Sequence, residues 1–248
     1  MGIVYGIGIF LLGIGQGFLN TVAGGGSFVV LPALTFVGLD LAVANATNRV
    51  GVIIQAISGA ATFHRHKVLD FRAALPLAGV SMLGSILGTL MAVQIDKRML
   101  NIVVAVLISI MAFLLVFRPK MWEGGERKPR PKWVVFAIFF AIGIYGGFLQ
   151  AGVGFFLTWA VAVVLGQDLV RGNALRTLIV AAFTTVSLAI FISKGLVVFS
   201  VGLVLAAGNM IGGVLGARFT VLKGNAWVRR ILAVVIVVSA IKMVASAF

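Results

Sequence analysis

The sequence contains no cysteine, two histidines and only six acidic residues among 248. The absence of cysteine excludes disulfides, thiolate nucleophiles and thiolate-bound metals. Ser27, the lone candidate for acyl transfer, has no histidine at its predicted depth, because His64 and His66 share one basic loop. We therefore predict that the protein is not an enzyme and holds no cofactor or metal. No carboxylate is available as a proton relay inside a membrane, since all six lie in predicted connections or at predicted helix ends: Asp40, Asp70, Asp96, Glu123, Glu126 and Asp168.

Hydrophobic residues are what the sequence has in excess, at 61% of the chain against 10% charged residues. A soluble domain has roughly 45–50% apolar and about 25% charged residues. Most of the chain lies in apolar runs of about 17 residues or more, the length that a helix needs to cross a bilayer. We predict an integral membrane protein, with the lipid bilayer as a partner. Nucleic-acid binding is not expected, because the basic residues stand at the ends of apolar runs.

Three blocks of the first half recur in the second half in the same order, about 130 residues later. This order indicates an internal duplication. The pairs are "GFLN" from Gly17 with "GFLQ" from Gly147, "GLDLAVAN" from Gly38 with "GQDLVRGN" from Gly166, and "SMLGSILG" from Ser81 with "NMIGGVLG" from Asn209.

Each half divides into five apolar elements, and an odd number inverts the second half relative to the first. We predict an all-α polytopic membrane protein of two inverted repeats, residues 1–117 and 133–248, joined by a basic cytoplasmic linker, 118–132, with eight to ten transmembrane elements. The predicted elements are 3–20, 27–38, 43–63, 72–93 and 99–117 in the first half, and 133–150, 154–166, 172–192, 196–218 and 228–246 in the second.

The distribution of basic residues agrees with this topology. Four connections on one predicted side hold 14 of the 20 lysines and arginines, as expected of the cytoplasmic side. Both termini are therefore predicted to be outside. The 14 residues are Arg65, Lys67, Arg72, Arg118, Lys120, Arg127, Lys128, Arg130, Lys132, Arg171, Arg218, Lys223, Arg229 and Arg230.

The stretch "GFLNTVAGGGSFVVLP", residues 17–32, predicts a hairpin hinge. The element after it, 27–38, reaches only roughly 18 Å at about 1.5 Å per residue and cannot cross the bilayer alone. Glycines permit positive φ and close approach of a ligand, Ser27 is a candidate N-cap, and the helix start attracts anions. Plain helix packing is the alternative. The predicted substrate-binding residues here are Asn20, Thr21, Gly24, Gly25, Gly26 and Ser27.

The paired segments "ANATNRVG" and "RGNALRTLIV" add Asn48, Arg49 and Arg176 to the predicted site. An arginine inside an apolar helix costs about 2.5–3.5 kcal/mol, so Arg176 is expected to face a cavity or a partner, where its fork suits a sulfonate, sulfite or carboxylate. Snorkelling to lipid headgroups is the alternative for both arginines.

Gln150 and Asn209 complete the predicted site. Gln150 is the counterpart of Asn20 in the second hinge, "QAGVG". Asn209 aligns with Ser81 in a glycine-rich pair whose four-residue spacing mostly indicates tight helix packing.

The motifs "GFLNTVAGGGSFVVLPAL", "NATN" and "GFLQAGVGF" together resemble the TauE/SafE family of sulfite and organosulfur anion exporters. The resemblance covers nearly the whole chain. It implies transport of small sulfur-containing anions, such as sulfite, sulfoacetate or related sulfonates, across a bacterial inner membrane. We predict export, and the distribution of basic residues then places both termini in the periplasm. Import of sulfonates or small carboxylates, and a non-transporting membrane scaffold, are the alternatives. The oligomeric state stays open, with a homodimer as one option. "GVGFF", from Gly152, departs from the glycine run of many members, so we expect unequal contributions from the two halves.

Overall fold

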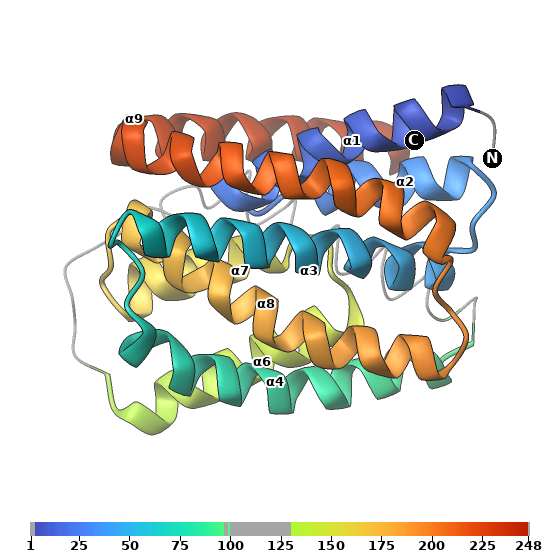
Figure 1. Ribbon diagram of the computed structural model, residues 1–248. Helices are drawn as coiled ribbons and strands as arrows, with labels where there is room; N and C mark the ends of the chain where they lie inside the picture. Colours follow the sequence, from blue (N-terminus) through green and yellow to red (C-terminus); the bar gives the residue numbers. More distant parts are fainter. Residues whose placement is uncertain (1–2, 97–98, 100–129, 248) are drawn as a thin grey trace.

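The computed structural model describes residues 3–96, 99 and 130–247, and no strand occurs among them (Figure 1). The predicted all-α fold is confirmed there. The predicted element 99–117 and the linker 118–132 fall almost entirely outside the described residues. The helices are α1 (Ile3–Val22), α2 (Ser27–Phe36), α3 (Leu41–Arg65), α4 (Phe71–Gln94), α6 (Lys132–Phe148), α7 (Val153–Trp159), the π-helix η2 (Ala160–Val164), α8 (Leu169–Ser193) and α9 (Phe199–Ala247).

The helix boundaries follow local chemistry. Asp168 is the N-cap residue of α8, and its side chain accepts hydrogen bonds from the amides of Val170 and Arg171. Asp40 is the equivalent N-cap residue of α3, without a side-chain capping hydrogen bond to the described backbone. In α9 the backbone is non-helical at Gly224, with φ 70° and ψ −172°, and the chain reverses direction after the orange arm (Figure 1).

Four described helical segments are long and apolar enough to cross a membrane: Val4–Val22, Phe71–Gln94, Leu169–Ser193 and Phe199–Leu232. The apolar segments Ser27–Phe36, Lys132–Phe148 and Val153–Val164 are shorter. The protein is thus a multi-pass membrane protein, and the count of eight to ten transmembrane elements stays a prediction.

Two peripheral helix pairs enclose a central pair. α1 packs on α9, α4 packs on α6, and α3 and α8 lie between these pairs and contact each other (Figure 1). Glycines bring the peripheral pairs together. Gly13 and Gly17 of α1 lie against the backbone of Leu205 and Asn209, and a Cβ at either glycine would lie 2.5 Å from a carbonyl oxygen of α9.

The α4–α6 pair repeats this packing with a shift of one turn. Gly147 of α6, the counterpart of Gly17, lies against Ser85. Asn209 therefore occupies the place of Ser85, whereas the sequence alignment pairs it with Ser81. Because the glycines recur every four residues, an alignment can shift by one helical turn and still match glycine with glycine. This explains the difference between the sequence alignment and the packing.

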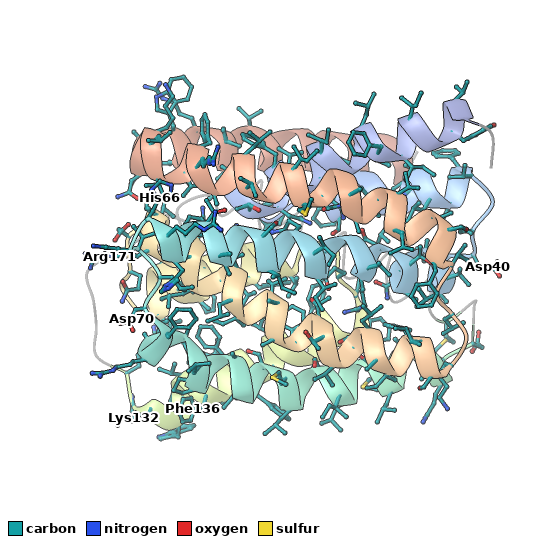
Figure 2. The ribbon with its side chains drawn as sticks, viewed as in Figure 1. Asp40, His66, Asp70, Lys132, Phe136 and Arg171 are labelled. Atoms are coloured by element: carbon teal, nitrogen blue, oxygen red, sulfur yellow. The ribbon has the colours of Figure 1, made fainter. Side chains whose placement is uncertain are left out.

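The basic loops gather at one end of the bundle. Figure 2 shows His66, Asp70, Lys132 and Arg171 at this end and Asp40 at the other. All four connections predicted to share a side therefore do so in their described residues, because Asn225 Oδ1 of the fourth accepts a hydrogen bond from the Val170 amide at 3.0 Å.

Candidate functional site

Two glycine loops meet inside the bundle. The loop between α1 and α2 has positive φ at Gly24 (90°), and the loop between α6 and α7 has positive φ at Gly152 (80°). The backbones of Gly24 and Gly154 touch, and a Cβ on Gly24 would lie 2.6 Å from the Cα of Gly154. Both halves thus contribute a tight hinge.

The first hinge differs in detail from the prediction. Only Gly24 of the three consecutive glycines has positive φ, and its amide donates to the carbonyl of Leu19. Gly26 is the N-cap residue of α2, so the prediction that Ser27 caps this helix is wrong. Position 26 requires glycine for a different reason, because a Cβ there would lie 2.5 Å from the carbonyl oxygen of Gln16. Gly25 lies between them, buried.

Arg176 of α8 binds the backbone carbonyls at the C-terminal end of α1. Its Nη2 donates to the carbonyls of Asn20 (2.8 Å) and Thr21 (2.7 Å), and its Nη1 donates to Thr158 Oγ1 (2.6 Å) and the Gly154 carbonyl (3.4 Å). The last carbonyls of a helix have no intrahelical partner and carry about half a negative charge. At 1% exposure, Arg176 does not snorkel to the protein surface.

Arg49 of α3 holds the end of α6 in the same way. Its Nη2 donates to the Gly147 carbonyl (2.7 Å), its Nη1 donates to Gln150 Oε1 (3.1 Å), and its guanidinium lies 5.0 Å from the centre of the Phe191 ring. The side chain is 0% exposed, and no described residue accepts a hydrogen bond from its Nε.

Two asparagines complete this reciprocal arrangement. Asn45 donates to the carbonyl of Phe148, the last residue of α6, at 2.9 Å. Asn173 donates to the carbonyl of Val22, the last residue of α1, at 2.8 Å. Helix α3 of the first half therefore secures α6 of the second half, and α8 of the second half secures α1 of the first.

The positive charges of the two arginines are hydrogen-bonded but not neutralised. Within the described residues neither guanidinium forms an ion pair, and the acidic side chains described, Asp40, Asp70, Asp96 and Asp168, are exposed in the connections. The dipole of each helix end offsets only about half of a unit charge. The interior of the bundle thus favours an anion.

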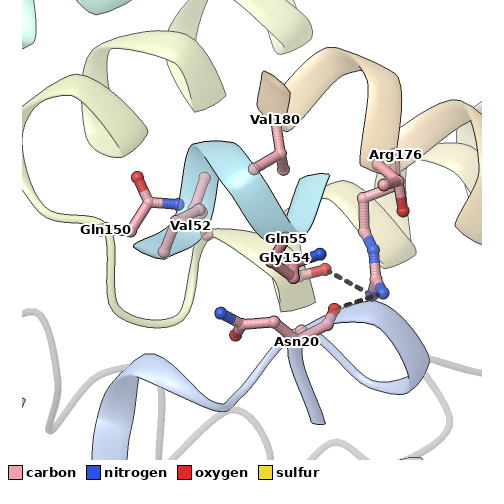
Figure 3. Close-up of a pocket in the computed structure, with 10 residues that line it drawn as sticks. Asn20, Val52, Gln55, Gln150, Gly154, Arg176 and Val180 are labelled. Carbon is pink, nitrogen blue, oxygen red and sulfur yellow. Dashed lines mark hydrogen bonds between the residues drawn. The ribbon is translucent and has the colours of Figure 1, made fainter. Parts of the chain in front are cut away.

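A small pocket lies where Arg176 faces the second hinge (Figure 3). It has room for about one water molecule. A sulfonate therefore enters only if the surrounding segments part. The pocket is lined by Asn20, Gly24, Val52, Gln55, Gln150, Val153, Gly154, Arg176, Thr177 and Val180.

The orientation of the Gln150 side chain follows from its neighbours. Its Oε1 accepts from Arg49 and from Thr184 Oγ1 (3.5 Å). A guanidinium only donates, so the amide oxygen must face Arg49. The amide nitrogen is turned the other way, toward Val52 (Figure 3). Arg49 thereby acts on the pocket through Gln150.

Three predicted residues lie in a separate amide cluster that does not line the pocket. Asn209 Nδ2 donates to Gln16 Oε1 (2.8 Å), Gln16 Nε2 donates to Asn48 Oδ1, and Asn48 Nδ2 donates to Ser27 Oγ (3.2 Å). Asn20 joins the cluster to the pocket through a 3.5 Å contact with Ser27 Oγ. The pocket therefore contains only part of the predicted site, and the buried amide cluster lies beside it.

Sequence reasoning missed Gln16, Gln55, Gly154, Thr158 and Thr184. Gln16 and Gln55 carried a signal, because each is an uncharged polar residue inside an apolar run. Thr158 and Thr184 carried none, since a threonine in a membrane helix commonly bonds to its own backbone.

A larger hollow at the loop end of the bundle is less suited to an anion. Its basic side chains, Lys67 and Arg171, are exposed. Asp70 also lines it, and Asp168 pairs with Arg171 at 3.8 Å, so the charges there balance.

Comparisons with known proteins agree with a membrane transporter. The family model described as "Sulfite exporter TauE/SafE" matches residues 9–243. A probable membrane transporter protein of Haemophilus influenzae is 29% identical over 238 residues, covering 95% of this chain and 93% of that protein. The probable membrane transporter protein YfcA of Escherichia coli is 27% identical over 95% of this chain and 88% of its own length. No solved structure matches.

Proposed function

Because the chain belongs to the TauE/SafE family of membrane transporters, we propose that it exports small sulfur-containing anions, such as sulfite, sulfoacetate or related sulfonates. The pocket beside Arg176 is the proposed binding site. The observation that carries this proposal is the pair of buried, uncompensated guanidinium groups at 0% and 1% exposure. An isolated buried charge carries a penalty of several kcal/mol, which an oxyanion offsets when it binds beside it.

The donors around the pocket suit an oxyanion. The Nη atoms of Arg176 hold backbone and threonine oxygens, so Nε is its remaining donor. The Gln150 amide nitrogen supplies a second donor. When the anion enters, Nη1 can exchange its hydrogen bonds to Thr158 Oγ1 and the Gly154 carbonyl for hydrogen bonds to the anion. The Arg176 guanidinium then offers the anion two adjacent donors, Nε and Nη1.

The proposed transport cycle uses two inverted repeats, residues 1–117 and 133–248, on either side of the linker 118–132. The reciprocal bonds of Asn45 and Asn173, and of Arg49 and Arg176, support this arrangement. Inverted repeats that rock against each other expose a central site to alternate sides. The two hinges touch at Gly24 and Gly154, so they move together.

The membrane potential is the proposed driving force. We place the termini in the periplasm and the basic loops of a bacterial inner membrane protein in the cytoplasm. One negative charge that moves outward through 100 mV, inside negative, releases about 2.3 kcal/mol. Export therefore proceeds without a coupled proton.

Inside-out vesicles test the direction and the driving force. With the cytoplasmic face outward, radiolabelled sulfite is expected to enter the lumen, and a lumen-positive potassium diffusion potential set with valinomycin is expected to accelerate its entry. Vesicles without the protein are the control. Uptake that depends on a pH gradient and not on the membrane potential would contradict the proposal. Acceleration only by a lumen-negative potential would also contradict it, because the membrane potential would then not drive the export of a negative charge.

Replacing Gln150 with glutamate separates stability from binding. The new carboxylate faces Arg49 within 3.1 Å, so we expect an unchanged or raised melting temperature. The pocket loses a donor to a charged group, worth about 1.5–3 kcal/mol, so the Kd for sulfite is expected to rise by a factor of about 10 or more. Thermal unfolding and isothermal titration measure the two effects, and wild-type affinity in Gln150→Glu would refute the donor role.

A further inference from the structure

Gln55 of α3 presents a buried acceptor that no described residue uses. The side chain is 3% exposed and lines the pocket beside Arg176. Its Nε2 donates to Thr21 Oγ1 at 2.8 Å, whereas its Oε1 receives no hydrogen bond from the described residues. Buried polar atoms are almost always satisfied, so this exception requires an explanation.

The orientation of this amide follows from Thr21. The Thr21 hydroxyl donates its one proton to the Gly17 carbonyl at 2.8 Å. Its oxygen can then only accept, which requires the nitrogen of Gln55 on that side. Rotating the amide by a half turn would place Gln55 Oε1 against Thr21 Oγ1, so that two acceptors would face each other. The oxygen is therefore the atom left without a partner.

The two side chains to which the proposed function assigns the anion, Arg176 and Gln150, present donors to it. Arg176 only donates, and the Gln150 amide is turned with its nitrogen away from Arg49. A simple oxyanion satisfies these two donors but leaves Gln55 Oε1 unpaired. An anion that also carries a hydrogen-bond donor satisfies all three.

We propose that the pocket selects small sulfonates or related oxyanions that carry one hydrogen-bond donor, such as a hydroxyl or amino group, and that Gln55 Oε1 accepts from this donor. The proposal rests on the proposed function and names its substrate class. Sites that hydrogen-bond a substrate hydroxyl discriminate against analogues that lack it, because the buried partner is then left unpaired.

Two sulfonates of equal charge and similar size test this selection: 2-hydroxyethanesulfonate and propane-1-sulfonate. Titration of the purified wild-type protein is expected to give a Kd about tenfold lower for the hydroxy compound. In Gln55→Met, which removes the acceptor at similar volume, the two Kd values are expected to be equal. In the control Val52→Ala, an apolar change one turn away on the same helix, both affinities change together and the tenfold ratio stays.

Equal binding of both sulfonates to the wild type would overturn the selection, as would a hydroxyl preference that survives in Gln55→Met. A water molecule that satisfies Gln55 Oε1 in every complex would give the first of these results. The wild-type comparison holds even if Gln55→Met fails to fold. If neither sulfonate nor sulfite binds a wild-type protein that unfolds cooperatively, the proposed function itself fails.

Discussion

Replacing Arg176 with glutamine is expected to weaken sulfite binding by a factor of at least about 100 and to reduce transport accordingly. The substitution removes the charge that faces the pocket and its donors to an anion. Each hydrogen bond to a charged group contributes about 1.5–3 kcal/mol, so the loss of two corresponds to a factor of about 100 or more. Titration with sulfite and vesicle uptake measure the effect. In Arg176→Lys the charge remains but the fork is lost, and an intermediate Kd is expected.

Arg49→Gln is the matched control for this prediction. Both arginines are buried and both hold the last carbonyls of a helix, so both variants are expected to lose similar thermal stability. Arg49 does not line the pocket and acts on it only through Gln150. Its loss is therefore expected to weaken binding less than the loss of Arg176. Equal loss of affinity in the two variants would show that the arginines are structural, with no specific role for Arg176 in binding.

Replacing Gly24 with alanine is expected to destabilise the protein by more than about 3 kcal/mol and to abolish transport. The φ of 90° is strained for alanine, and the added Cβ would lie 2.6 Å from the Gly154 backbone and 2.9 Å from Arg176 Nη1. Backbone strain contributes about 1–3 kcal/mol, and overpacking contributes a similar amount. The melting temperature in detergent and the yield of folded protein measure the effect.

Gly15→Ala is the control, because no atom lies within 4 Å of a Cβ at this position in α1. Its melting temperature is expected to equal that of the wild type or to rise slightly, as alanine favours helix over glycine. Gly154→Ala is expected to reproduce the defect of Gly24→Ala from the other side of the contact. A Gly24→Ala protein as stable as Gly15→Ala would contradict the close contact between the hinges.

The sequence indicated the polar residues of the interior because each interrupts an apolar run. Arg176 and Asn20 were found in this way, and both line the pocket. What each polar side chain contacts could not be predicted, since the acceptors of Arg176 are mainly backbone carbonyls, which carry no sequence signal. Snorkelling and burial of Arg49 also could not be separated, because the choice depends on how α3 is surrounded by other helices.

The hinges show a second limit of the sequence. Three glycines in a row predicted a special first hinge, yet positive φ occurs once in each hinge, at Gly24 and Gly152. A short glycine motif such as "GVG" meets the same backbone requirements as the longer run. Similarly, Gln55 was visible as a polar residue, but its unpaired oxygen depends on the hydroxyl of Thr21 on another helix.

Crystals grown with 2-bromoethanesulfonate would test most directly whether the anion binds between the two hinges. Bromine gives an anomalous signal that locates the ligand without prior assumptions. We predict one strong peak in the pocket, with the sulfonate on Arg176 and Gln150, and loss of this peak in Arg176→Gln. A peak confined to the hollow at Lys67 and Arg171, with none between the hinges at saturating ligand, would contradict the account.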